Sequence, residues 1–282
     1  MEVKVFEKDY RSRKDVFKLH PLGDIHGGIL HCDEKAIKAR IKDIAEDPFA
    51  LWIGMGDYAE FIDPRDNRWD PEITSPWVQQ GNVISSQRKW VTKLFRPIVD
   101  KCVGLIEGNH EEKIRKRTFN DVYMDICEDL GVTPLGYSCF VDFKFRRTPR
   151  GKEGGSVTSF VGHFKHGSGG GTTKGWKINT LLRGVKDFPE CSIYAMGHLH
   201  DIITDKDTPL HMTAHGHLGQ KMKAVAMTGC WVQTYKEGVR PSYAEAKGYS
   251  PSPIDAPIFY ITPDKGIVSV AWATEITAGS KD

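Results

Sequence analysis

Side chains that bind metal ions recur at the ends of short apolar runs in this chain. They are Asp24 and His26 in "GDIHGG", Asp57 in "GMGDY", Asn109 and His110 in "EGNHEE", His166 in "FKHGSGGG", and His198 and His200 in "MGHLHD". Each segment touches a glycine, and each preceding run has the length and the Val, Ile and Phe content of a strand. Because parallel strands gather their carboxyl ends along one sheet edge, where α/β proteins build binding sites, we expect these side chains to converge.

The residue types favour two divalent transition-metal ions. Imidazole nitrogens and carboxylate oxygens without thiolates suit manganese, which we favour, or iron, zinc, cobalt or nickel. Residues two apart in an extended segment point to the same side, so Asp24 can converge with His26, and His198 with His200. Asp24 and Asp57 supply the formal negative charge, so two divalent ions would keep roughly two positive charges, enough for a phosphate anion and a hydroxide.

The elements around these segments indicate a layered α/β protein. "DEKAIKARIKDIAED" has a helical apolar stripe with Asp33 as N-cap, and "FNDVYMDICEDLG" has another that stops at Gly131. Strands and helices alternate in the first half, whereas strands dominate the second, which favours an α/β sandwich. "PDKG" predicts a hairpin turn between the strands "PIFYIT" and "GIVSVAWA".

Length, charge and cysteine content limit the classes of protein to which this chain can belong. At 282 residues and a formal charge of +2, the chain has room for one large domain, and its net charge does not indicate nucleic-acid binding. We expect one domain over 1–282, with inserted loops near 63–97 and 167–180. No apolar run reaches the roughly 18 residues of a membrane span, and the charged N-terminus lacks a signal-peptide core. The six cysteines include no C-x-x-C pair, so we expect a reducing, cytoplasmic protein without a thiolate zinc site.

In this order, the blocks "GDIHG", "GD", "GNHE", "HG" and "GHLH" resemble the motifs of the calcineurin-like metallophosphoesterases. The resemblance covers residue 19 to about residue 200 and implies a four-layer α/β/β/α sandwich of two mixed sheets flanked by helices. It also implies a ligand set in which one ion is held by Asp24, His26 and His200, the other by Asn109, His166 and His198, and both by the bridging Asp57.

Hydrolysis of a phosphate ester follows from such a centre. A hydroxide shared by the ions would attack phosphorus while the ions neutralise the phosphate oxygens. His110 lies beside Asn109 and is not a ligand in the family pattern, so we expect it to contact substrate and protonate the leaving group. A carboxylate that supports His110 would be Glu60 or Glu111, and the sequence does not separate the two.

The substrate is less well defined by the sequence than the reaction. Protein serine/threonine phosphatases of this superfamily read GDxVDRG, whereas this chain reads "GDYAEFI", with Glu60 and Phe61 in place of Asp-Arg. In "HGSGGGTTKGWKIN", the glycines permit an anion-binding nest, Lys174 and Lys177 can meet phosphate, and Trp176 can stack on a base. We therefore favour a phosphodiesterase or nuclease acting on a nucleotide or nucleic acid. A phosphomonoesterase on a small metabolite is the alternative, and a non-catalytic metal-binding scaffold is less favoured.

Several other residues leave alternatives open. His163 precedes His166 closely enough to compete as a ligand, and "HMTAHGHLG" offers a second H-x-H motif, although "GHLH" fits a strand end better. The loop 63–82, with Trp69 and Trp77, would either cover the metal ions as a lid or pack as a surface insertion. "RKRTF" at 115–119 is either an exposed helix face or a nucleic-acid patch.

Overall fold

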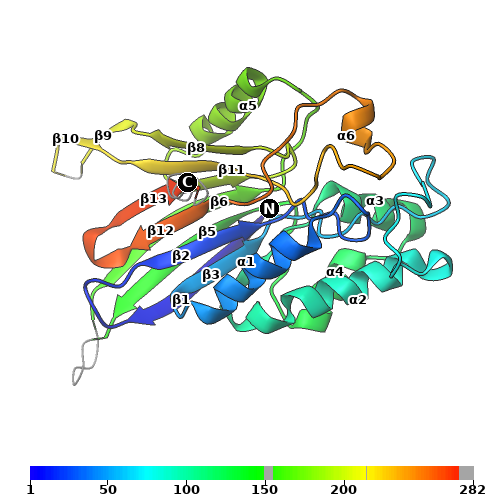
Figure 1. Cartoon of the computed structure of the whole chain (residues 1–282). Helices are drawn as coiled ribbons and strands as arrows, with labels where there is room; N and C mark the ends of the chain where they lie inside the picture. The colour runs from blue at the N-terminus through cyan, green and yellow to red at the C-terminus, as the bar shows by residue number, and fades with distance from the viewer. Residues whose placement is uncertain (149–154, 214, 273–282) are drawn as a thin grey trace, which may run out of the picture.

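Two mixed β-sheets pack face to face, with helices on both outer faces (Figure 1). This computed structural model describes residues 1–148, 155–213 and 215–272, so the end of the expected domain 1–282, including Ala273 of the last predicted strand, lies outside the described residues. The six-stranded sheet has the order β1 (Glu2–Tyr10), β5 (Ser138–Arg147), β6 (Val157–Lys165), β7 (Ile193–Met196), β11 (Lys223–Thr228) and β8 (Ile202–Asp207). The five-stranded sheet has the order β13 (Ile267–Ala271), β12 (Ile258–Thr262), β2 (Phe17–Leu22), β3 (Ala50–Gly54) and β4 (Cys102–Leu105).

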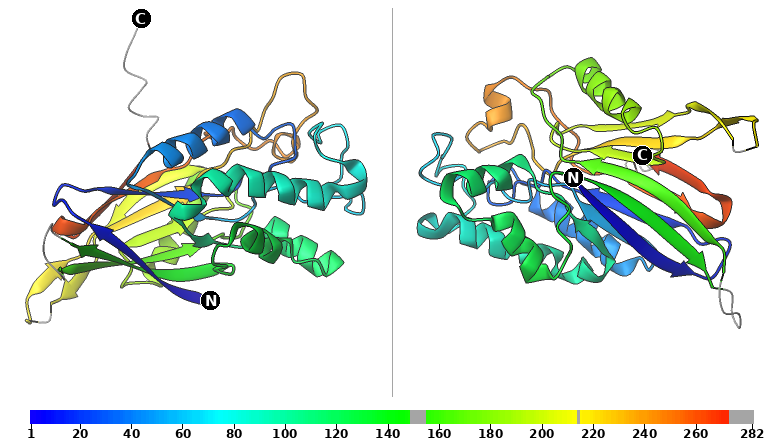
Figure 2. Two further views of the ribbon diagram at one scale, coloured as in Figure 1. Left: turned by 90° about the horizontal axis from the view of Figure 1, so that it is seen from below. Right: turned by 180° about the vertical axis from the view of Figure 1, so that it is seen from behind.

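The helices complete the expected four layers. They are α1 (Glu34–Glu46), α2 (Val83–Phe95), α3 (Asn109–Thr118), α4 (Val122–Leu130), α5 (Lys174–Lys186) and the short α6 (Tyr243–Ala246), with 3₁₀ turns at Gln80–Asn82, Arg96–Lys101 and Pro263–Lys265. Helices α1, α2 and α4 share an apolar core with the five-stranded sheet, and α5 shares another with the six-stranded sheet on the opposite side (Figure 2). The predicted sandwich of two mixed sheets flanked by helices is confirmed.

Strand β7 contributes side chains to two apolar cores, one on each face of its sheet. Ile193 and Ala195 are buried between the sheets, whereas Tyr194 and Met196 are buried against α5. Successive side chains of a strand point to opposite faces, so a run that is apolar at every position is buried on both sides.

The two helices and the hairpin that the sequence indicated are present. The Asp33 side chain accepts a hydrogen bond from the Ala36 backbone N–H and caps α1, and Gly131 ends α4 in the left-handed conformation at φ 68°. Strands β12 and β13 pair antiparallel around the turn at Pro263–Lys265. Each of these signals is local in the chain, which explains why the sequence alone revealed it.

Two expected loops contain helices instead. The segment 63–97 includes α2, and 167–180 includes the start of α5. In α2 the buried side chains Val83, Gln87, Val91 and Leu94 follow a helical period, which the polar Gln87 obscures in the sequence. The histidines of "HMTAHGHLG" lie in the hairpin of β9 (Leu210–Met212) and β10 (Leu218–Gln220), which projects from the six-stranded sheet (Figure 1).

Within the described ranges, none of the helices has both the length and the apolar character that crossing a lipid bilayer requires.

Candidate metal centre

The expected ligand segments lie at one edge of the two sheets. Strands β2, β3 and β4 are mutually parallel in one sheet, and β6 and β7 are parallel in the other. All eight side chains singled out from the sequence follow the carboxyl ends of these five strands. They are Asp24 and His26 after β2, Asp57 after β3, Asn109 and His110 after β4, His166 after β6, and His198 and His200 after β7.

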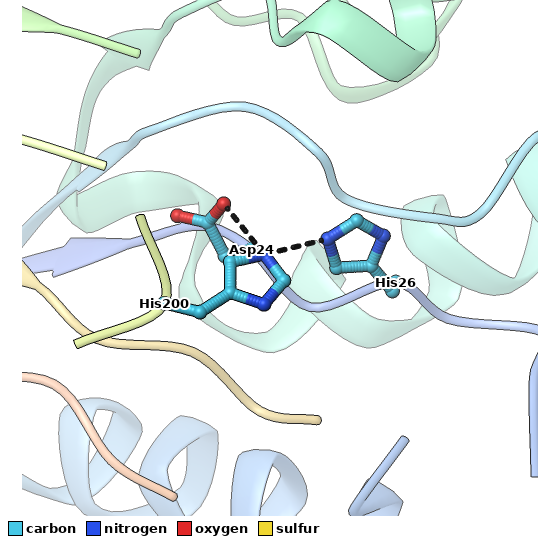
Figure 3. Close-up of side chains that lie close together, drawn as sticks. All are labelled: Asp24, His26 and His200. Carbon is cyan, nitrogen blue, oxygen red and sulfur yellow. Dashed lines mark hydrogen bonds and ion pairs between the residues drawn. The ribbon is translucent and has the colours of Figure 1, made fainter. Parts of the chain in front are cut away.

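Asp24, His26 and His200 form the first group (Figure 3). The Nε2 atoms of the two histidines lie 3.1 Å apart, and Nε2 of His200 lies 3.3 Å from Oδ1 of Asp24. Asp24 is fully buried and His26 nearly so. Three donor atoms from two sheets therefore face a common point, as the ligands of a single cation do.

Asp57, His166 and His198 form the second group. Oδ2 of Asp57 lies 3.2 Å from Nε2 of His166, whose Nε2 also lies 2.9 Å from Oδ1 of Asn109. The same Asp57 oxygen is 3.9 Å from Nε2 of His26 in the first group. Asp57 thus stands between the two groups, the position of a carboxylate that contacts two ions.

The outer nitrogens of two histidines are already occupied. Nδ1 of His26 lies 2.9 Å from Oε2 of Glu60, and Nδ1 of His166 lies 2.7 Å from the Met55 carbonyl oxygen. A carbonyl can only accept, so Nδ1 of His166 carries a hydrogen, and Nε2 is the ring nitrogen left to bind an ion. Such partners fix the ring of a metal-bound histidine and leave one nitrogen for the ion. The donor set therefore fits divalent cations.

The carboxylates and imidazoles of the two groups shift one another's pKa. Burial raises the pKa of Asp57, but the neighbouring His166 and His110 outweigh it and hold the pKa well below the usual range. Burial also lowers the pKa of His200, but Cys230 and Asp24 outweigh it, so the pKa is raised well above its ordinary value. The Asp57 carboxylate thus stays ionised, and the Asp24 carboxylate favours positive charge on His200, a charge that a divalent ion would supply instead.

The backbone brings the ligands together in a way that the sequence did not indicate. The predicted convergence of Asp24 with His26 is confirmed and that of His198 with His200 is wrong, and neither pair lies in an extended strand, because the chain has left the strand at these positions. Five of the candidate ligands have positive φ, namely Asp24 at 49°, His26 at 49°, Asp57 at 52°, His198 at 71° and His200 at 47°. Asp24 and His26 still meet in one group, whereas His198 and His200 turn into different groups.

The His110 ring contacts a main-chain carbonyl rather than a carboxylate. Its Nδ1 lies 2.5 Å from the carbonyl oxygen of Glu60, and its backbone N–H donates to Oδ1 of Asp57 at 2.9 Å. The Glu60 carboxylate faces His26 instead. The Glu111 carboxylate accepts from the backbone N–H groups of Asp57, Tyr58 and Gly108.

Burial, and next the charge of Asp57, raise the pKa of the Glu111 carboxyl to about 7. Among the described residues, the His110 ring bonds to the Glu60 carbonyl, whereas the Glu60 carboxylate bonds to His26 and the Glu111 carboxylate to backbone N–H groups. Glu60 nevertheless holds His110 through its carbonyl, and the protein brings His26, Glu60 and His110 together as a third group.

The glycine-rich segment lies beside the second group. The Gly169 carbonyl oxygen is 3.1 Å from Nε2 of His198. Trp176 packs beneath this segment, because a methyl group on Gly169 or Gly171 would collide with its indole ring. Lys177 pairs with Asp201 at 3.3 Å, and Lys174 is exposed at the start of α5. Of the three proposed substrate contacts, only Lys174 has an exposed side chain without such a packing or pairing role.

The competing histidines lie elsewhere. His163 stacks against Phe188, with ring centroids 3.8 Å apart, and lies 5.5 Å from the Tyr194 ring; it is not part of the clusters among the described residues. His211, His215 and His217 are exposed on the β9–β10 hairpin. "GHLH" therefore supplies the histidines of the centre.

Helix α2 supports the first ligand loop, which the sequence analysis did not foresee. A methyl group on Gly27 would lie 2.3 Å from the Trp90 ring, and one on Gly28 would lie 2.2 Å from the Gln87 amide. Trp77 stacks on Trp90 at 5.4 Å, so this part of the loop 63–82 packs as an insertion. The paired glycines of "GDIHGG" are the available signal, since they indicate close approach of another element.

Comparison with solved structures finds similar chains at low sequence identity. No protein-family model matches the chain, and no curated protein matches it in sequence. Vacuolar protein sorting 29 of Cryptosporidium parvum is 11% identical over 91% of this chain and 96% of its own, with a TM-score of 0.40. The calcineurin-like phosphoesterase YfkN of Bacillus subtilis is 10% identical over 75% of this chain and 90% of its own, with a TM-score of 0.37. The NAD nucleotidase NadN of Haemophilus influenzae is 9% identical over 92% of this chain and 49% of its own, with a TM-score of 0.39.

The layer order and the strand-end motifs together define the class that the chain resembles, the calcineurin-like metallophosphoesterases. The fold is metallophosphoesterase-like, and it presents groups of His and Asp side chains suited to divalent metal ions.

Proposed function

We propose that this protein is a dinuclear metal-dependent phosphoesterase that hydrolyses a phosphodiester of a nucleotide or nucleic acid. The observation that carries the proposal is the position of Asp57, whose Oδ2 lies 3.2 Å from His166 in one group and 3.9 Å from His26 in the other. One ion would be held by Asp24, His26 and His200, the other by Asn109, His166 and His198, and both by Asp57. Bound ions would supply Lewis acidity and an activated water.

The protein's own groups orient the substrate. Because Nδ1 of His110 is engaged by the Glu60 carbonyl, Nε2 is the atom left to meet the phosphate ester. His110 would donate a proton to the leaving oxygen, and its backbone bond to Asp57 ties it to the bridging carboxylate. Lys174, exposed beside the glycine-rich segment, would attract the phosphate. We propose manganese as the favoured ion and a diester as the favoured substrate.

Metal content and turnover test this function together. The purified protein is loaded with manganese, iron, zinc, cobalt or nickel, and its metal content is compared with hydrolysis of bis(p-nitrophenyl) phosphate and p-nitrophenyl phosphate. Asp57→Asn and His198→Ala should abolish turnover and lower the metal content, whereas exposed His217→Ala should match the wild type. His110→Gln should keep both ions and lose activity by about 10²-fold, as expected for a general acid.

The outcomes separate the alternatives. Turnover of the monoester alone would assign a phosphomonoesterase. Two bound ions without turnover of any ester would indicate a metal-binding scaffold. Absence of bound ions, or wild-type turnover by Asp57→Asn, would contradict the proposed centre.

A further inference from the structure

A cluster of cationic side chains extends from the metal centre along helix α3. Lys113 and Arg117 follow Asn109 at four-residue steps, so these three side chains lie on one stripe of the helix. Each step advances about 6 Å along the axis. The stripe therefore begins at a candidate metal ligand and leads away from the centre over two helical turns.

A single carboxylate organises the cations of this stripe. Asp66 is nearly buried, and its Oδ2 lies 2.6 Å from Arg117, 3.7 Å from Lys113 and 3.0 Å from Arg68. Nε of Arg68 also donates to Oδ1 of Asp66 at 3.2 Å, which gives a two-point contact. Three cations share one carboxylate, so the cluster formed by Arg68, Lys113 and Arg117 keeps about two positive charges for another anion.

The loop that carries Arg68 is fixed to the metal centre. It leaves the segment of Asp57 and Glu60, and it returns where Ser75 donates a backbone hydrogen bond to the Gly28 carbonyl at 2.9 Å. Burial lowers the pKa of Arg68, but Asp66, and after it Glu60 and Asp57, outweigh this effect and raise the pKa. The carboxylates of the centre thus interact electrostatically with Arg68, while about a third of its side chain stays exposed.

We infer that the cluster of Arg68, Lys113 and Arg117 binds a second phosphate of the substrate, next to the phosphate at the metal ions. The ligand would be a nucleotide that carries phosphates on both its 3′ and 5′ oxygens, as each unit of a polynucleotide strand does. The inference rests on the proposed function, because the metal ions fix the first phosphate. It assigns a role to this loop and to "RKRTF" beyond hydrolysis of an isolated ester.

The alternative is that these cations only stabilise the loop. Arg65 illustrates that case, since it pairs with Asp63 in a two-residue contact on the surface. Lys116 is another such residue, because it lies on α3 but off the stripe and pairs with Glu112 at 2.8 Å. In contrast, the clustered cations outnumber their carboxylate and start beside a candidate ligand, so they suit an anion that arrives with the substrate.

Binding measurements separate this inference from the function on which it rests. Calorimetry compares thymidine 3′,5′-bisphosphate with thymidine 5′-phosphate on the full-length, manganese-loaded protein. We expect the bisphosphate to bind about tenfold more tightly, the effect of one charged hydrogen bond. Arg68→Gln and Lys113→Gln, each made separately, should bring this ratio close to one, whereas the matched control Lys116→Gln should keep it.

The ratio is taken within each preparation, so a misfolded fraction lowers the number of binding sites for both nucleotides equally and leaves the ratio of affinities unchanged. Equal affinity of the wild type for the two nucleotides would overturn the inference while leaving the metal centre intact. An unchanged ratio in both cluster variants would also overturn it. If neither nucleotide binds and no ester is hydrolysed, the proposed function itself fails.

Discussion

The buried, neutral histidine His163 makes stability depend on pH independently of the metal centre. Its ring stacks against the Phe188 ring, and both of its ring nitrogens are buried without a hydrogen-bond partner within the described part of the chain. Burial, and secondarily the charge of Lys165, lower its pKa from 6.5 to about 4. The unfolded chain therefore takes up a proton on His163 at a pH where the folded protein does not.

The size of the stability loss at low pH follows from the linkage between protonation and folding. Above about pH 6.5 both states are neutral at His163 and stability is unaffected. As the pH falls, only the unfolded state is protonated at first, so stability decreases until the folded pKa is reached. Between about pH 7.5 and pH 5, the expected loss due to this residue is about 2 kcal/mol.

Replacement of His163 by phenylalanine isolates this contribution. The His163→Phe variant keeps an aromatic ring in the stack and removes the titrating nitrogens. Urea unfolding of wild type and variant is measured at both pH values, so that the titration of the metal-centre carboxylates and imidazoles is common to both proteins. The free energy of unfolding of the variant should exceed that of the wild type by about 2 kcal/mol more at pH 5 than at pH 7.5.

The exposed His217→Gln variant serves as the control and should follow the wild type at both pH values. Parallel pH profiles for wild type and His163→Phe would show that His163 is hydrated or already paired, and would refute the reasoning.

Three further predictions concern the centre and its support. Manganese at about a hundredfold excess over its Kd should stabilise the wild type by about 3 kcal/mol, seen as a raised Tm, and should leave Asp57→Asn unchanged. Glu60→Gln should lower metal affinity by about 10- to 100-fold in competition titrations, because the carboxylate orients His26. Gly27→Ala should destabilise the protein by about 1–3 kcal/mol in urea unfolding, because the added methyl meets an indole ring at 2.3 Å. The control Gly81→Ala should be nearly neutral, because no atom lies within 4 Å of its added methyl.

The sequence revealed the parts of the fold whose signals are local. Helix α1 has an apolar stripe and a capping aspartate, and the strands before the ligand segments are short apolar runs. Strand β1 lacks such a run: most of its residues are charged, and it lies at the edge of its sheet beside β5 and is largely exposed. Its pairing partner lies more than a hundred residues away, so no local pattern reveals the pairing.

The parts of the site that depend on tertiary contacts were harder to predict. The sequence predicted that the ligand segments lie at one sheet edge, because parallel strands place their carboxyl ends there. It did not show that Trp176 packs under glycines or that Lys177 pairs with Asp201, because these contacts form only when α5 docks. Similarly, the Glu60 carboxylate contacts His26 and the Glu60 carbonyl contacts His110. The spacing of these residues in the sequence does not indicate which Glu60 group meets which histidine.

The left-handed backbone at five candidate ligands is held by contacts between the ligand segments themselves. Each such residue costs about 1 kcal/mol or more, so the conformation persists only where neighbours enforce it. The Asp57 carbonyl accepts hydrogen bonds from Ile25 and His26, the Asp24 carbonyl accepts one from Trp231, and the Asp24 carboxylate accepts the backbone N–H of His198. The segments therefore fix one another's directions before any ion binds. Because Asp24 both faces the centre and holds the backbone of His198, its loss would disturb both groups of ligands rather than the one that it joins.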